Sequence, residues 1–184
     1  MATSKHKSLT FDAVCALGSA LIEVADVYPL SCRTERDFYP LVVAYLHGRV
    51  PSVKTEAATE EGSVDVRTGG YNPALLELAV APRILSDRNH PNQKFPGHQS
   101  TTQLYACQNK TELSKLTGVP QSKAKNRYLL LIDLTGKHDL KKLQSGYESE
   151  LPPGGGGAAV RVVYVRRGRN GTKDFRLGGK RKKK

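Results

Sequence analysis

Two apolar stretches with strand-like alternation, separated by a turn, restrict the fold of this chain more than any other feature. They span residues 63–67 and 75–80, and glycine, asparagine and proline between them favour a tight turn. Because side chains alternate along a strand, the aliphatic residues should share one face. These residues are Val64, Val66, Leu76, Leu78 and Val80. Asp65, Glu77 and Ala79 should then lie on the other face, with Asp65 opposite Glu77.

The facing carboxylates of Asp65 and Glu77 predict a site for a hard divalent cation. Two such groups repel each other, and bound Mg2+ or Mn2+ would offset that cost. The alternative is a half-buried hairpin whose outer face is simply hydrated, because acidic residues are common on exposed strand faces.

Periodicity along the rest of the chain predicts an α/β fold. Helices are expected over residues 8–28, 34–48, 99–116 and 137–149, and strands over 53–58, 63–68, 74–81, 128–134 and 160–165. Pro40 favours a later start for the second helix. The uniformly apolar strand 128–134 should lie centrally, covered on both faces. The expected architecture is a mixed central sheet flanked by helices, with the acidic site on an antiparallel hairpin.

The length of 184 residues suits one sizeable domain. We expect an N-terminal helix in residues 1–33, a core in 34–167 and a basic, disordered tail in 168–184. The three cysteines are scattered and lack metal-ligand spacing, which indicates a reducing compartment. No apolar stretch is long enough to cross a bilayer, and the N-terminus lacks a signal peptide pattern, so a cytoplasmic location without a membrane partner is expected.

The net charge of +12 is concentrated in the C-terminal segment. Residues 160–184 contain eleven Lys or Arg against the single acid Asp174. The cations expected to contact nucleic acid there are Arg166, Arg167, Arg169, Lys180, Arg181, Lys182, Lys183 and Lys184. Such a tail predicts sequence-independent, salt-sensitive binding to DNA, with RNA as a second option. A solubilising tail or a nuclear-import signal is the alternative.

The order helix, three antiparallel strands, helix, apolar strand, short helix and strand resembles the PD-(D/E)XK nuclease superfamily, the restriction-endonuclease-like fold, over roughly residues 34–165. The resemblance implies that Asp65 and Glu77 hold Mg2+, with the main-chain carbonyl of Leu78 as a further ligand and Glu35 as a third acid. It also implies a contact role for Gln99 and Gln103 near the start of the next helix.

The chain departs from that family where Ala79 replaces the motif lysine. That lysine would position the attacking water and neutralise charge on the phosphate. A cation from elsewhere could replace it, and Lys54, Arg67, Arg83 and Lys94 are the candidates. The sequence does not choose among them, although Arg67 is the weakest as a base because guanidinium stays protonated.

We therefore expect a metal-dependent DNA endonuclease or a close derivative of one. Arg83, Arg88 and Lys94, in the polar loop after residue 81, could contact phosphate, and a plain surface loop is the alternative. The rival functions are a nuclease-fold protein that binds DNA without cutting it, and an RNA-binding or ribosome-associated protein that acts through its tail. A homodimer would suit cleavage of both strands, but no interface is identified.

Overall fold

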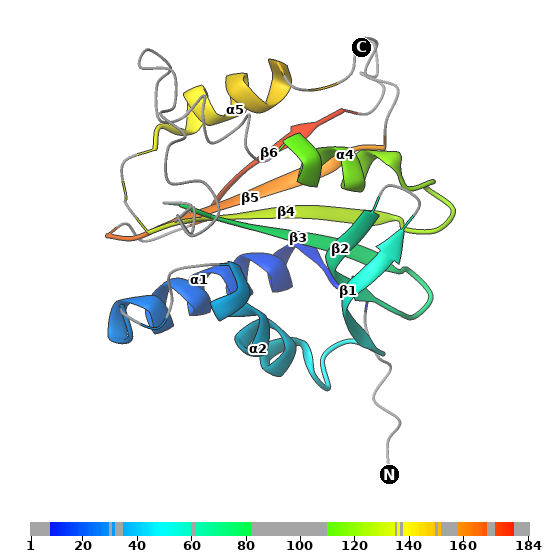
Figure 1. The fold of residues 1–184 in the computed structure, drawn as a ribbon, viewed down its shortest axis with the longest axis horizontal. Helices are drawn as coiled ribbons and strands as arrows, with labels where there is room; N and C mark the ends of the chain where they lie inside the picture. Colours follow the sequence, from blue (N-terminus) through cyan, green and yellow to red (C-terminus); the bar gives the residue numbers. More distant parts are fainter. Residues whose placement is uncertain are drawn as a thin grey trace, which may run out of the picture.

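Four helices cover a six-stranded open sheet in the described part of the chain (Figure 1). The computed structural model describes residues 8–29, 31, 35–59, 62–81, 110–134, 136, 138–149, 151, 158–168 and 172–178. The helices are α1 (Phe11–Val27), α2 (Glu35–Leu46), α4 (Lys110–Gly118) and α5 (Leu140–Ser149). The strands are β1 (Val53–Thr59), β2 (Gly62–Thr68), β3 (Ala74–Ala81), β4 (Asn126–Asp133), β5 (Val160–Arg166) and β6 (Lys173–Leu177).

The strands lie across the sheet in chain order. β1, β2 and β3 form an antiparallel meander, β3, β4 and β5 run parallel, and β6 returns antiparallel to β5. β3 and β4 occupy the middle of the sheet, and every residue of β3 is buried. The predicted meander and the predicted central position of the apolar strand are therefore confirmed.

The sheet divides the hydrophobic core into two layers. α1 and α2 cover one face, and α4 and α5 cover the other (Figure 1). Thr10 caps α1, where its side chain accepts the N–H of Ala13 at 3.2 Å. A Cβ at Gly18 would lie 2.8 Å from a methyl carbon of Val165, so this glycine lets α1 pack closely on the sheet. The N-terminal helix thus shares the core of the sheet.

Two details differ from the sequence-based expectations, and a third expectation lies partly outside the described residues. α2 begins at Glu35 and contains Pro40. The predicted helix 99–116 is described only from Lys110, as α4, and residues 99–109 lie outside the described part. Residues 173–177 form β6, so the prediction of a disordered tail from residue 168 is wrong for this segment. Phe175 and Leu177 explain the difference because both are buried against the core on the α4 and α5 side.

Candidate acidic site between strands β2 and β3

Asp65 and Glu77 meet where β2 and β3 stop pairing. Their ladder runs from Thr68 opposite Ala74 to Val66 opposite Leu76. At the next position the Oδ2 atom of Asp65 accepts the main-chain N–H of Leu78 at 2.7 Å. The carboxyl of Asp65 thus contacts the backbone of β3 directly. The negative charge of Asp65 raises the pKa of Glu77, so the two carboxyl groups lie close enough to interact electrostatically.

The strand alternation predicted for this hairpin breaks at Asp65. Val66 packs on the α1 and α2 side with Leu76, as expected, but Val64 packs on the α4 and α5 side. The break coincides with an unusual backbone in β1, where Glu56 stands between two paired positions, opposite Asp65, with a φ of +48°. A residue other than glycine is rarely found at positive φ. At this point β2 changes the face on which its side chains pack, and three consecutive residues of β2 are buried.

Tyr39 of α2 fixes the orientation of Asp65. Its hydroxyl donates to Oδ1 of Asp65, while Leu78 donates to Oδ2. Burial and the neighbouring acids Asp65, Glu35 and Glu77 raise the pKa of the Tyr39 hydroxyl, which therefore stays protonated as a donor. Glu35 begins α2, one turn before Tyr39. The charges of the three acids predicted from the sequence thus all act on the hydroxyl of one tyrosine.

Glu77 has no hydrogen-bond donor among the described residues. Its side chain is 0% exposed, and neither carboxylate oxygen accepts an N–H or O–H. Burial, and then the charge of Asp65, raise the pKa of Glu77 to about 9. Without another cation Glu77 is therefore protonated at neutral pH and can donate to Asp65.

The nearest described cation is Lys115 of α4, whose Nζ lies 3.8 Å from Oε1 of Glu77. Ala79, at the position of the motif lysine, is fully buried in the core. Glu112 lies one turn before Lys115, is 9% exposed, and raises the pKa of Glu77 further. The Lys115 ammonium therefore approaches Glu77 from the sheet face that α4 covers, whereas Tyr39 approaches Asp65 from the face that α2 covers.

Sequence reasoning missed Tyr39, Glu112 and Lys115. Tyr39 had one available signal, since it lies four residues after Glu35 and therefore on the same helix face. Glu112 and Lys115 had none, because their approach to Glu77 depends on how α4 packs over the sheet.

The other predicted cations lie in several places. Lys54 is exposed on β1 directly beside Arg67 of β2. The guanidinium of Arg167 donates to Asp26 and to the carbonyl of Ala25, which ties β5 to α1. Arg166 donates to the carbonyl of His138 at 3.4 Å. The remaining predicted contact residues lie outside the described part: Arg83, Arg88, Lys94, Gln99, Gln103, Arg169, Lys180, Arg181, Lys182, Lys183 and Lys184.

In the described ranges, no three His, Cys, Asp or Glu side chains come together as a metal-binding group. Nor does any described helix combine the length and apolarity needed to cross a bilayer. Comparison with protein-family models, with curated proteins and with solved structures finds no match for this chain.

Proposed function

We propose that this chain is a metal-dependent endodeoxyribonuclease built on a restriction-endonuclease-like core. The element order supports the fold part of the proposal. The antiparallel meander β1, β2 and β3 is followed by α4 and by β4 parallel to β3, with helices on both faces. This is the arrangement that the resemblance to the nuclease superfamily implies for its core.

The observation that carries the proposal is the state of Glu77. A buried carboxylate normally has hydrogen-bond donors, and leaving one without them costs free energy. Glu77 has none among the described residues, and the negative charge of a second carboxyl, that of Asp65, acts on it. Such an arrangement is unfavourable for a purely structural acid, and a divalent cation between the two groups would relieve it.

The donor set suits Mg2+ or Mn2+, because carboxylate oxygens are the preferred ligands of hard cations. Asp65 and Glu77 would hold the ion, with the Leu78 carbonyl and Glu35 as the further ligands implied by the resemblance. When bound, such an ion activates water for attack on a phosphodiester and stabilises developing negative charge.

The remaining side chains have separate roles in this proposal. Tyr39 holds Asp65 by donating to Oδ1, which leaves the carboxylate fixed while charge changes nearby. Lys115 supplies the positive charge that the motif lysine would have supplied at position 79, where this chain has alanine. Its ammonium is the nearest described cation to Glu77. An ammonium group in this position can neutralise charge on a phosphate held by the acid pair.

A second candidate is a protein of the same fold that binds DNA without cleaving it. Two observations favour it: Ala79 replaces the motif lysine, and Glu77 is completely buried. A protonated Glu77 beside the Asp65 carboxylate would leave the pair with one negative charge instead of two, which removes the repulsion that a metal would otherwise offset. RNA binding remains the third candidate and rests on the basic residues near the C-terminus.

Cleavage of supercoiled plasmid with Mg2+, Mn2+ or EDTA tests the proposal. We expect metal-dependent nicking by the parent chain and a loss of at least about a hundredfold in Asp65→Asn, the usual scale for removing a group that stabilises transition-state charge. Lys115→Met should be impaired, while Lys142→Met, at an exposed position on α5, should match the parent.

The outcomes separate the three candidates. An uncut plasmid that is nevertheless bound in a gel-shift assay favours the DNA-binding protein. Preferential binding of structured RNA favours the third candidate. Full activity in Asp65→Asn removes the acid pair from the mechanism.

A further inference from the structure

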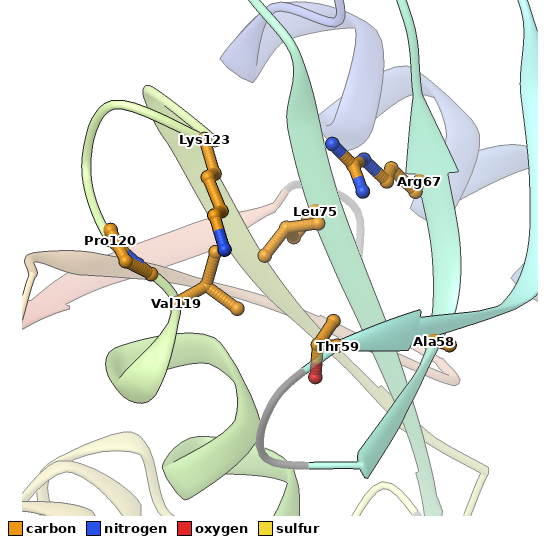
Figure 2. A pocket seen from close by; sticks show the side chains of 7 residues that line it. All are labelled: Ala58, Thr59, Arg67, Leu75, Val119, Pro120 and Lys123. Atoms are coloured by element: carbon orange, nitrogen blue, oxygen red, sulfur yellow. The ribbon is translucent and has the colours of Figure 1, made fainter.

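A pocket of about 300 Å³ lies on the α4 side of the sheet, between the β1–β2 hairpin and the segment that joins α4 to β4. Its lining is mainly apolar, from Ala58, Leu75, Val119 and Pro120, and it also contains the cations Arg67 and Lys123. Figure 2 shows the Arg67 guanidinium and the Lys123 ammonium approaching the space near Leu75 from different walls. No acidic residue is among the described residues that line it.

Two residues that line the pocket, Arg67 and Leu75, belong to a row of paired residues that crosses four strands. Lys54, Arg67, Leu75 and Arg127 are successive ladder partners on β1, β2, β3 and β4. Arg127 is 3% exposed and donates to the carbonyl of Val119. It therefore fixes one wall of the pocket and adds a buried positive charge beside Leu75.

This basic row is adjacent to the acid pair. Leu75 and Glu77 are two residues apart on β3 and so lie on the same face, roughly 7 Å apart along the strand. That spacing is on the order of one nucleotide step of a nucleic-acid backbone. A phosphodiester at Asp65 and Glu77 would place its neighbouring nucleotide at the pocket.

We propose that the pocket lined by Ala58, Arg67, Leu75, Val119, Pro120 and Lys123 binds one unpaired nucleotide of the nucleic-acid substrate. The base contacts the apolar lining, and the phosphate lies between Arg67 and Lys123. This inference rests on the proposed function and names its substrate class: DNA with a single-stranded end, flap or extruded base.

The size and chemistry of the pocket favour this ligand over a paired duplex. Its volume is at the lower end for ligand pockets, enough for one nucleotide. A base inside a duplex is stacked and paired, so it enters such a pocket only after leaving the helix, at a cost that an unpaired base avoids. The cations supply the phosphate contact, which is independent of sequence.

The test measures binding of the full chain in EDTA, so that the result does not depend on cleavage. The probes are a fluorescent blunt duplex and the same duplex with a single-stranded thymidine overhang, with dTMP, thymidine and inorganic phosphate as competitors. We expect tighter binding of the overhang, and competition by dTMP that exceeds competition by either thymidine or phosphate.

Three variants report on the pocket itself. Ala58→Tyr fills it from an exposed position and should abolish the preference for the overhang. Arg67→Gln and Lys123→Gln should each weaken overhang binding about tenfold, the loss expected for one charge-assisted contact. Each should also reduce the slope of log K against log salt concentration by about one, the change expected for the loss of one phosphate contact. Lys141→Gln, an exposed lysine on α5, is the matched charge control.

Equal binding of blunt and overhang probes by the parent chain overturns the inference, as does an Ala58→Tyr protein that keeps the preference. Circular dichroism and the thermal midpoint establish that each variant is folded, and Arg67→Lys should recover part of the binding lost in Arg67→Gln. If the overhang preference and its loss are observed while plasmid stays uncut, the nucleotide site stands and the cleavage proposal alone fails.

Discussion

Asp133 and Glu77 are the two most deeply buried carboxylates in the described part of the sheet, and their surroundings are opposite. Asp133, at the end of β4, is 1% exposed and accepts hydrogen bonds from the N–H groups of Gly136 and His138 and from the hydroxyl of Tyr164. Glu77, at 0% exposure on the neighbouring strand, accepts none from the described residues. Asp133 organises the turn that follows its strand. The burial of Glu77 without donors lowers the stability of the folded chain. Glu77 is therefore the candidate for a functional residue, whereas Asp133 has a structural role.

The difference follows from which groups surround each acid. Near Asp133 the chain turns back so that two main-chain N–H groups point at the carboxylate, and Tyr164 of β5 completes the set. Near Glu77 the neighbours are another acid, Asp65, and a lysine at 3.8 Å. Donor-rich surroundings stabilise a charge in place, whereas acid-rich surroundings attract an external cation.

The largest stability effect should come from Asp133→Ala. Removing this carboxylate takes the acceptor from the N–H groups of Gly136 and His138, and one of two acceptors from the Tyr164 hydroxyl. The free energy of unfolding should fall by on the order of 3 kcal/mol. Asp174→Ala is the matched control, because Asp174 makes a partly exposed ion pair with Arg161 and should cost less than about 1 kcal/mol. Urea unfolding measures both, and equal losses would contradict the contrast between the two acids.

The next largest effect should be a pH-dependent gain in Glu77→Gln. Since the folded state raises the pKa of Glu77 to about 9 from its ordinary 4.5, it favours the protonated acid. The stabilisation is complete below about pH 4.5 and is lost as pH rises towards 9. Compared with the parent, Glu77→Gln should therefore become progressively more stable over this range, by about 1–3 kcal/mol at the alkaline end.

Urea unfolding at several pH values, without divalent cations, checks that prediction. Glu148→Gln, at an exposed position on α5, serves as the control, and its stability relative to the parent should not change with pH in this way. A constant difference between parent and Glu77→Gln from pH 5 to 9 would mean that Glu77 is ionised throughout. Glu77 would then have hydrogen-bond donors or a cation that stabilise its charged form as the donors of Asp133 do.

Tyr39→Phe should have the smallest effect, since it removes a single hydroxyl donor from Asp65 while Leu78 still donates to the other oxygen. The expected loss in unfolding free energy is about 1 kcal/mol. Tyr164→Phe is the corresponding change at Asp133, and two N–H donors remain there. Thermal unfolding of both variants compares them, and a larger loss at Tyr39 would indicate that Asp65 is held mainly from α2.

Local pattern was enough to locate most secondary structure and the acid pair. Strand alternation and turn residues are properties of neighbouring residues, so the hairpin of β2 and β3 could be recognised, and with it the meeting of Asp65 and Glu77. The apolar run of β4 likewise predicted its central place. The same reasoning failed at Val64, next to the position where Glu56 of the partner strand has its positive φ.

The amino-acid order alone established an α/β sheet with two acids on facing strands and a concentration of positive charge near the C-terminus. Folding in three dimensions decided the properties on which chemistry depends: the unsatisfied burial of Glu77, the cation from α4, the tyrosine from α2 and the pocket over Leu75. The reason is that desolvation and charge interactions depend on spatial neighbours. Those neighbours come from elements that lie far apart along the chain.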